Sequence, residues 1–185
     1  MPDKRVVGIS GNITRPSKTR TFIDHIVHRL AMSVGASAQT FDIEDFGPSL
    51  ASARRLDDLA PEARYIVNQA ITADVLVVGS PTFKGSYTGL FKHCFDLFDP
   101  SSLRGKPVIL AATGGGERHS LIVEHQLRPL FGFFEALAMP TAIYASDKDF
   151  VDGALISEAI HARVGQAVEE ATRVLGHSDR RSIAA

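Results

Sequence analysis

Residues 75–99 read VLVVGSPTFKGSYTGLFKHCFDLFD, and this stretch indicates the fold class. The apolar run at 75–78 is followed by Gly79 and Pro81, a pattern typical of a strand buried on both faces. From Tyr87 to Phe98 the apolar side chains recur at the spacing of one helix face. A strand followed by a helix is the repeating unit of a parallel α/β sheet, which binds ligands at the carboxyl ends of its strands. We therefore expect residues 80–86, the loop between the two, to bind a ligand.

Four more strands and four more helices are predicted along the chain. We expect the strands at residues 4–10, 37–43, 107–113 and 141–146. We expect the helices at residues 18–34, 61–73, 119–138 and 154–175, with Gly35 as the cap that ends the first. Residues 46–60 have no clear period. Because an unstructured loop of about 15 residues is usually functional, this segment is a candidate cover for the ligand site.

Five strands alternating with helices predict a doubly wound α/β fold, a three-layer sandwich around a five-stranded parallel sheet. For a chain of 185 residues the flavodoxin-like strand order 2-1-3-4-5 is the natural choice, and another three-layer order is the alternative. The length is that of one domain. We assign this domain to residues 1–176 and expect residues 177–185 to form a flexible C-terminal tail.

Composition and charge exclude several classes of protein. The formal net charge is -1, so the chain has no basic field to attract nucleic acid or anionic lipid, and it lacks the strong acidity of a small electron carrier. No run of about 18 apolar residues could span a bilayer, and residues 1–10 lack the apolar core of a signal peptide. The single cysteine, Cys94, lies on an apolar helix face, which favours a buried structural thiol. We expect a cytoplasmic protein.

Residues 11–20, GNITRPSKTR, follow the first strand and open the first helix. Backbone N–H groups and the helix dipole favour an anion at such a place. The side chains that could donate to a phosphate here are Asn12, Ser17, Lys18, Thr19 and Arg20. The segment is not a Walker A loop, because Ser17 stands where that motif requires glycine. The alternative to a phosphate site is a capped surface turn.

The fourth strand runs through Thr113 into Gly114, Gly115 and Gly116. Three consecutive glycines let backbone amides approach a ligand with no side chain in between. Together with the loops at 11–20 and 80–86, this places three ligand-type loops at one edge of the sheet. No metal site is predicted, because no carboxylate or thiol completes a ligand set around the histidines of the first helix.

The sequence SPTFKGSYTGLFKHCFDL, at 80–97, resembles the flavin loop of the flavodoxin-like, NAD(P)H-dependent FMN reductases, whose usual form is S-P-x-Y-x-G-S-Y-S-G-x-L-K. With lysine before the glycine, it is most similar to the reductases that supply reduced flavin to sulfonate monooxygenases. The resemblance extends from about residue 6 to about residue 175. It departs at Phe83, where the family commonly has tyrosine.

This resemblance implies an FMN site across the three loops, with the phosphate in the first. The second loop would hold the ring and the ribityl chain through Pro81, Thr82, Phe83, Lys84 and Gly85. A positive charge on Lys84 near the ring would stabilise the reduced flavin, although a solvent-exposed loop lysine is the alternative. Thr113 and the three glycines would close the site around the polar edge of the flavin.

The helix at 119–138 is apolar over most of its circumference, which indicates burial on more than one side. The residues expected to face the sheet are Leu127, Leu130, Phe131, Phe134 and Leu137. The apolar residues on its other sides are Ile122, Phe133 and Ala136. We therefore expect a homo-oligomer, a dimer or a tetramer, with this helix at a contact.

Pro129 interrupts this helix, because it has no N–H and its ring presses on the carbonyl of His125. A proline kink or a one-residue π-bulge would relieve the conflict. The sulfonate-linked reductases have a π-helix here at a subunit contact, so the resemblance implies a π-turn around residues 123–127. His125 would then project across the interface and help to govern flavin release. The alternative is a simple kink with His125 on the surface.

We predict an NAD(P)H-dependent FMN reductase that uses FMN with NADH or NADPH. A hydride passes from the nicotinamide to the flavin, so the chemistry requires no catalytic side chain. The resemblance implies that reduced FMN then leaves for a partner flavin-dependent monooxygenase of sulfonate metabolism. The alternatives are a quinone, azo or chromate reductase with tightly bound FMN, and a flavodoxin-type electron carrier. A P-loop phosphotransferase is disfavoured by the missing glycine.

Overall fold

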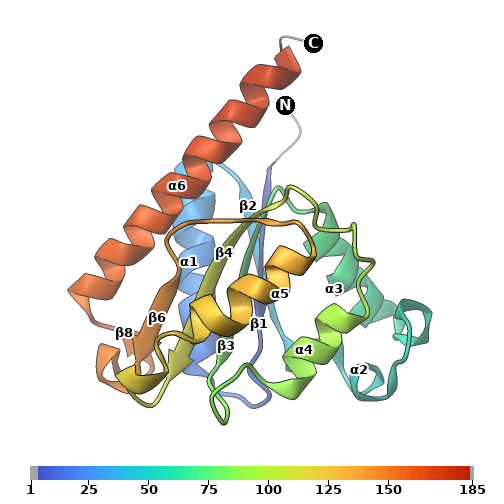
Figure 1. Ribbon diagram of the computed structural model, residues 1–185, viewed down its shortest axis with the longest axis horizontal. Helices are drawn as coiled ribbons and strands as arrows, with labels where there is room; N and C mark the ends of the chain where they lie inside the picture. Colours follow the sequence, from blue (N-terminus) through green and yellow to red (C-terminus); the bar gives the residue numbers. More distant parts are fainter. Residues whose placement is uncertain (1–3, 184–185) are drawn as a thin grey trace.

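The computed structural model describes residues 4–183, with side chains described as far as residue 176. It is a three-layer α/β sandwich built on a parallel sheet (Figure 1). In sheet order the strands are β2 Ser37–Asp42, β1 Arg5–Ser10, β3 Val75–Pro81 and β4 Pro107–Gly114, followed by β5 Leu137–Ala138 and β6 Ile143–Ser146. The predicted order 2-1-3-4-5 is confirmed. Two short strands, β5 and β6, share the fifth position, and both pair with β4. Pro140 lies between them and has no N–H to donate to the sheet.

β3 lies at the centre of the sheet, between β1 and β4. All its residues before Pro81 are buried, which explains why its sequence is continuously apolar rather than alternating. Gly79 permits close packing on both sides, because a Cβ there would lie 2.5 Å from Ile23 Cδ1 and 2.6 Å from the carbonyl oxygen of Ala111. The predicted central strand is confirmed.

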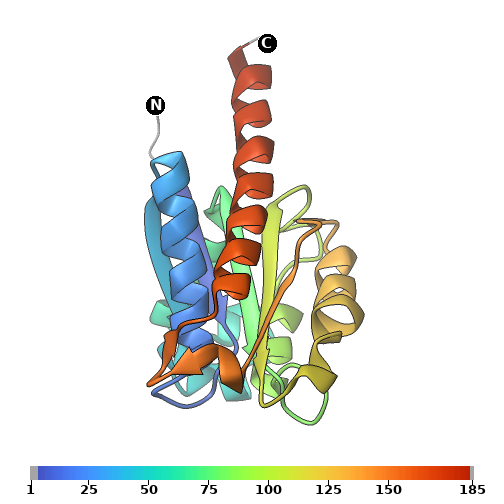
Figure 2. The ribbon, with the colours of Figure 1, turned by 90° about the vertical axis from the view of Figure 1, so that its left-hand side faces the viewer.

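Helices cover both faces of the sheet (Figure 2). α1 Lys18–Val34 and α6 Glu158–Ile183 pack on one face, and α3 Pro61–Thr72, α4 Gly89–Asp96 and α5 Arg128–Phe133 pack on the other. Gly35 ends α1 with φ at 64°, as predicted for a glycine cap. Each face of the sheet has its own apolar cluster.

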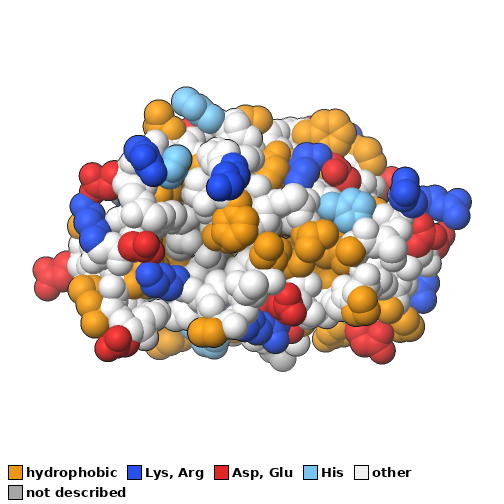
Figure 3. Space-filling model, turned by 90° about the horizontal axis from the view of Figure 1, so that it is seen from below, with side chains coloured by type: hydrophobic (Ala, Val, Ile, Leu, Met, Phe, Trp, Pro, Cys, Tyr) orange, Lys and Arg blue, Asp and Glu red, His pale blue; other side chains and the backbone are white. Residues whose placement is uncertain are grey.

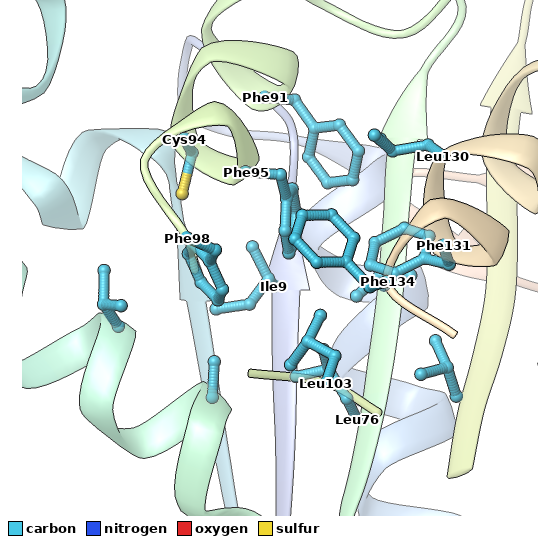
Figure 4. Packing of buried hydrophobic residues seen from close by; sticks show 14 of the residues in the cluster. Ile9, Leu76, Phe91, Cys94, Phe95, Phe98, Leu103, Leu130, Phe131 and Phe134 are labelled. Carbon is cyan, nitrogen blue, oxygen red and sulfur yellow. The ribbon is translucent and has the colours of Figure 1, made fainter. Parts of the chain in front are cut away.

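Phenylalanine side chains join α4 to α5 (Figure 4). The ring centroid of Phe95 lies 4.9 Å from that of Phe131 and 5.0 Å from those of Phe91 and Phe98. Most of these contacts are close to the edge-to-face geometry that aromatic rings prefer. The cluster fixes the two helices relative to each other, and it therefore fixes the loops that precede them.

The predicted helix at 119–138 is wrong in its extent. The segment consists of a 3-10 turn at Glu117–His119, a π-helix at Val123–Leu127 and α5, which ends at Phe133. Glu135 adopts a left-handed conformation with φ at 53°, and the next residues pair with β4. Leu137 is therefore 46% exposed in β5 and does not belong to the row of helix residues that faces the sheet.

Residues 46–60 are also more ordered than predicted. They contain α2 Ser49–Ser52 and a 3-10 turn at Leu56–Asp58. Leu50, Ala53 and Leu59 are buried in the core, so the lack of a regular period reflects short turns packed on the sheet layer. None of residues 46–60 is among the described residues that line the cleft presented below, so the segment does not cover it.

The last helix differs from prediction at both ends. Ala154–Leu155 forms β8, which pairs with β7 Phe150–Val151, and α6 begins at Glu158. α6 then continues through Gly176 to Ile183, past its predicted end at 175, because one glycine costs a helix only about 1 kcal/mol. Residues 184 and 185 of the predicted tail lie outside the described residues. No helix in the described part of the chain is long and apolar enough to cross a membrane.

Candidate functional site

The three predicted loops meet at the edge of the sheet where the parallel strands end. Together with a fourth loop, after β6, they surround a cleft of about 350 Å³. Figure 3 views the molecule from this side, where hydrophobic side chains gather across the middle of the face with charged side chains around them. The predicted residues that line the cleft are Asn12, Ser17, Lys18, Thr19, Pro81, Thr82, Phe83, Thr113, Gly114 and Gly115. The predicted residues outside its lining are Arg20, Lys84, Gly85 and Gly116.

The first loop is held tightly against the central strand. The N–H of Gly11 donates to the carbonyl of Gly79 at 2.7 Å, and a Cβ on Gly11 would lie 2.8 Å from both Phe91 Cδ2 and Ser80 Oγ. The amide group of Asn12 is buried and donates to Asp42 Oδ2 and to the carbonyl of Thr14. Since both of these donations are internal, the Asn12 side chain shapes the loop rather than offering a free donor to a ligand.

The N-terminus of α1 opens into the cleft. Ser17 caps it, with its hydroxyl accepting from the N–H of Arg20 at 3.3 Å. The first turn carries Lys18, Thr19 and Arg20 and no acidic residue, so the positive end of the helix dipole is not neutralised from within the helix. Lys18 Nζ lies 2.8 Å from Asp147 Oδ1, across the cleft in the loop after β6. The positive end of the helix and the ammonium group of Lys18 suit an anion such as phosphate.

Arg20 does not reach the cleft as predicted. Its guanidinium lies 2.7 Å from Asp45 Oδ2 and 2.9 Å from Asp42 Oδ2, and it also donates to the carbonyl of Thr40. Arg15 binds the same two carboxylates. Burial acts to raise the pKa of Asp42, but hydrogen bonds from Arg15, Asn12 and Arg20 outweigh it and lower the pKa to about 2. Both arginines are thus held by an acidic pair at the end of β2.

The second loop contains a tight turn from Phe83 to Ser86. The backbone N–H and carbonyl groups of these two residues are paired at 2.8 and 3.1 Å, while Lys84 and Gly85 have positive φ angles of 53° and 86°. These are the features of a type I′ hairpin turn. The turn places Lys84 at an exposed tip and leaves Phe83, 48% exposed, at the rim of the cleft. Ser86 Oγ donates to Gln126 Oε1 at 3.1 Å, which ties the turn to the π-helix.

The third loop begins where β4 ends and is braced from three sides. Thr82 donates to the carbonyl of Thr113 through its N–H and its hydroxyl, at 2.7 and 2.8 Å. The hydroxyls of Thr19 and Thr113 lie 2.7 Å apart. Tyr144, on β6, donates its hydroxyl to the carbonyl of Gly116 at 2.6 Å. A Cβ on Gly114 would overlap the Tyr144 hydroxyl, so glycine is required for this packing.

The loop after β6 was not predicted as part of the site. Asp147 from this loop, with Ser146 at the end of β6 and Phe150 at the start of β7, lines the cleft. The first loop adds Ile13, Thr14 and Pro16. The strand at 141–146 was predicted to be parallel, so the rule that ligands bind at strand carboxyl ends could have identified its loop.

A comparison with protein families matches residues 4–150 to the family described as NADPH-dependent FMN reductase. The chain belongs to this family. The predicted FMN reductase, with FMN and a reduced nicotinamide coenzyme as its cofactors, is thereby confirmed.

Individual proteins similar to this FMN reductase include two that are named FMN reductases and one solved structure of an oxidoreductase. A Pseudomonas aeruginosa protein named FMN reductase (NADPH) is 39% identical over 93% of this chain and 92% of its own length. A Pseudomonas fluorescens protein named NADH-dependent FMN reductase SfnF is also 39% identical, with the same coverage. An X-ray structure of an oxidoreductase from Corynebacterium diphtheriae has 32% identity and a TM-score of 0.85, covering 95% of this chain and 98% of that one.

The residues present in this FMN reductase fit FMN. The α1 N-terminus, with Ser17 and Lys18, offers the donors that a phosphate requires. On the other side of the cleft, Pro81 and Phe83 supply apolar surface for a flat ring. Gly114, in the glycine run, lines the cleft with backbone alone, and a Cβ at this position would collide with its neighbours. Donors at one end and an apolar wall at the other match the two ends of FMN.

The predicted π-turn is confirmed over Val123–Leu127. The N–H of Arg128 bonds to the carbonyl of Val123, five residues earlier, just before Pro129. His125 is exposed and, with Tyr87, Phe98 and Phe133, lines an apolar groove of about 610 Å³ between α4 and α5. Cys94 is buried, and its burial raises the pKa of the thiol, as expected for a structural cysteine.

Proposed function

We propose that this FMN reductase binds FMN with the phosphate at the N-terminus of α1 and the ring between the loops at 80–86 and 113–116. When bound, FMN accepts a hydride from NADH or NADPH. The observation that carries the proposal is the convergence of the three loops on one cleft, with a glycine run as its inner wall. Ser17 and Lys18 would hold the phosphate, Pro81 and Phe83 would contact the ring, and Thr19 and Thr82 would position Thr113.

Reduced FMN then leaves for a flavin-dependent monooxygenase that acts on a sulfonate. Two features support release rather than permanent retention. Arg15 and Arg20 are held by Asp42 and Asp45, and Lys18 is paired with Asp147, so each of these three cations already has a carboxylate partner. The sulfonate link itself rests on the resemblance of residues 80–97 to the flavin loop of sulfonate-linked reductases.

The active form is a homo-oligomer, a dimer or a tetramer, that uses the groove beside the π-helix as a contact. Phe133, which is 67% exposed, adds to the apolar lining of this groove, and a contiguous apolar surface of this kind is typical of an interaction site. Ser86 and Gln126 connect the π-helix to the ring-binding loop, so a contact made through His125 could influence the flavin. His125 therefore has a place in the proposal as an interface residue that affects flavin release.

The enzymatic proposal is tested by following NADH and NADPH oxidation with FMN, FAD and a quinone, after recording whether flavin copurifies. We expect FMN to be reduced, little flavin to copurify, and sulfite to form when a sulfonate monooxygenase and its substrate are added. Tightly retained flavin with quinone as the preferred acceptor would instead favour the quinone reductase. Failure to reduce FMN with either coenzyme would refute the proposal.

The interface proposal is tested with His125→Ala, using His28→Ala as the control because His28 is exposed on α1, away from the groove. Sedimentation at micromolar concentration and FMN turnover are measured for both. We expect only His125→Ala to shift the oligomer toward monomer and to change turnover. A wild-type protein that is strictly monomeric would refute the oligomer, and a His125→Ala protein that matches wild type would refute the role of His125.

A further inference from the structure

Two opposite charges face each other across the cleft. Among the described residues that line it, only Lys18 and Asp147 carry a charge. They form an ion pair at 2.8 Å that joins the first turn of α1 to the loop after β6. Their side chains are 45% and 61% exposed, so the pair is accessible to solvent and to a ligand.

The carboxylate of Asp147 lies between the two places that the ligand would occupy. On one side it contacts Lys18, at the helix N-terminus proposed for the phosphate. On the other side, a Cβ built on Gly115 would lie 3.8 Å from Asp147 Oδ2, so the carboxylate stands over the glycine run. A flavin phosphate therefore meets Lys18 only by sharing it with Asp147 or by displacing that carboxylate.

The neighbouring cations do not relieve this competition. Arg15 and Arg20 are bound to Asp42 and Asp45 outside the lining of the cleft. Lys148, next to Asp147, forms its ion pair with Glu117, and both side chains are exposed. The phosphate of FMN carries nearly two negative charges at neutral pH, so the carboxylate of Asp147 would repel it where both approach Lys18.

We propose that Asp147 sets the affinity of the cleft for FMN by competing with the flavin phosphate for Lys18, and that it thereby promotes flavin release. The inference rests on the proposed placement of FMN and adds the residue that keeps its binding weak. Because both side chains are about half exposed, solvent and salt screen the interaction, and the effect is moderate.

The test is Asp147→Asn, which removes the charge and keeps the shape. FMN and riboflavin are titrated by fluorescence, and FMN dissociation is followed by rapid mixing with excess competitor. We expect about three- to tenfold tighter FMN binding, slower FMN dissociation and unchanged riboflavin binding, since riboflavin has no phosphate. The increase in FMN affinity of Asp147→Asn over wild type should become smaller at about 0.5 M salt, because the screening length is then only a few ångströms.

Three further variants make the result specific. Asp147→Glu keeps the charge and should behave as wild type. Lys18→Met should weaken FMN binding, and adding Asp147→Asn to it should restore part of the loss by removing the remaining repulsion. Asp57→Asn removes an equal charge from an exposed position outside the cleft and should change nothing. Thermal unfolding without ligand checks that each variant is folded.

The outcomes separate this inference from the proposed function. If wild type binds FMN but Asp147→Asn binds it no more tightly, Asp147 does not set the affinity. If riboflavin binding improves as much as FMN binding, the effect does not act through the phosphate, and the inference is again overturned. If wild type binds no FMN, the proposed function itself fails, and the inference fails with it.

Discussion

At the scale of single residues, Gly114 is the position where one added methyl group would most disturb the cleft. Its Cβ would overlap the Tyr144 hydroxyl and lie 3.1 Å from Thr82 Oγ1. We expect Gly114→Ala to lower the free energy of unfolding by about 1–3 kcal/mol and to weaken FMN binding, since Tyr144 or the loop must move. Thermal unfolding and FMN titration measure both effects. Gly116→Ala is the matched control, because no described heavy atom lies within 4 Å of a Cβ there; equal behaviour of the two variants would contradict the prediction.

At the scale of elements, Asp42 joins the end of β2 to the first loop and to α1. Its pKa is about 2 in the folded protein, below the ordinary 3.8. The carboxylate therefore stabilises the fold above about pH 4, and this contribution is lost as the pH falls from 3.8 toward 2. We expect Asp42→Asn to lower the free energy of unfolding by about 1–3 kcal/mol at pH 7. The difference in this free energy between the variant and wild type should become smaller as the pH falls from 3.8 toward 2. Urea unfolding at a series of pH values measures it, and a difference that stays constant down to pH 2 would argue against the network.

The phenylalanine cluster between α4 and α5 belongs to the same scale. Phe131 is fully buried against Phe95, whereas Met32 on α1 is mostly exposed. We expect Phe131→Ala to lower the free energy of unfolding by about 3–5 kcal/mol, because it leaves a cavity between the helices. Met32→Ala, also a truncation of a large apolar side chain, should change it by less than about 0.5 kcal/mol. Similar losses for the two variants, measured by urea unfolding, would mean that the cluster does not hold the helices together.

At the scale of the whole molecule, FMN should stabilise the fold by binding only to the native state. At an FMN concentration of about 100 times Kd the gain is about 2.7 kcal/mol. For a chain of this size, that corresponds to a rise in Tm of about 5–10 °C. Thermal unfolding at increasing FMN should show a continuous rise, with a smaller rise for riboflavin at equal concentration. A Tm that does not change with FMN would show that the native state does not bind FMN at these concentrations, which contradicts the prediction.

The sequence by itself determined the features that depend on neighbouring residues. The central strand and the Gly35 cap follow from an apolar run and a glycine, which act within one or two turns of the chain. The missing N–H of Pro129 predicted a proline kink or a π-bulge, and the resemblance to the sulfonate-linked reductases favoured the π-turn that the structure has. The strand order 2-1-3-4-5 was the natural choice for five strands alternating with helices in a chain of this length, and the structure has this order rather than another three-layer order. The ligand loops were predicted because a parallel sheet binds ligands at the carboxyl ends of its strands, and most of their predicted residues line the cleft.

Only the tertiary structure decided which partner each polar side chain takes. Arg20 was predicted to bind phosphate. Strand pairing instead brings Asp42 and Asp45 beside α1, and both carboxylates form ion pairs with its guanidinium. Lys18 meets Asp147, 129 residues away, because β6 lies beside β4 and ends at the same edge. The helix ends at Phe133 because the residues after it pair with β4. Charges and backbone groups bind whatever lies nearest in space, and a sequence pattern reports only what lies nearby along the chain.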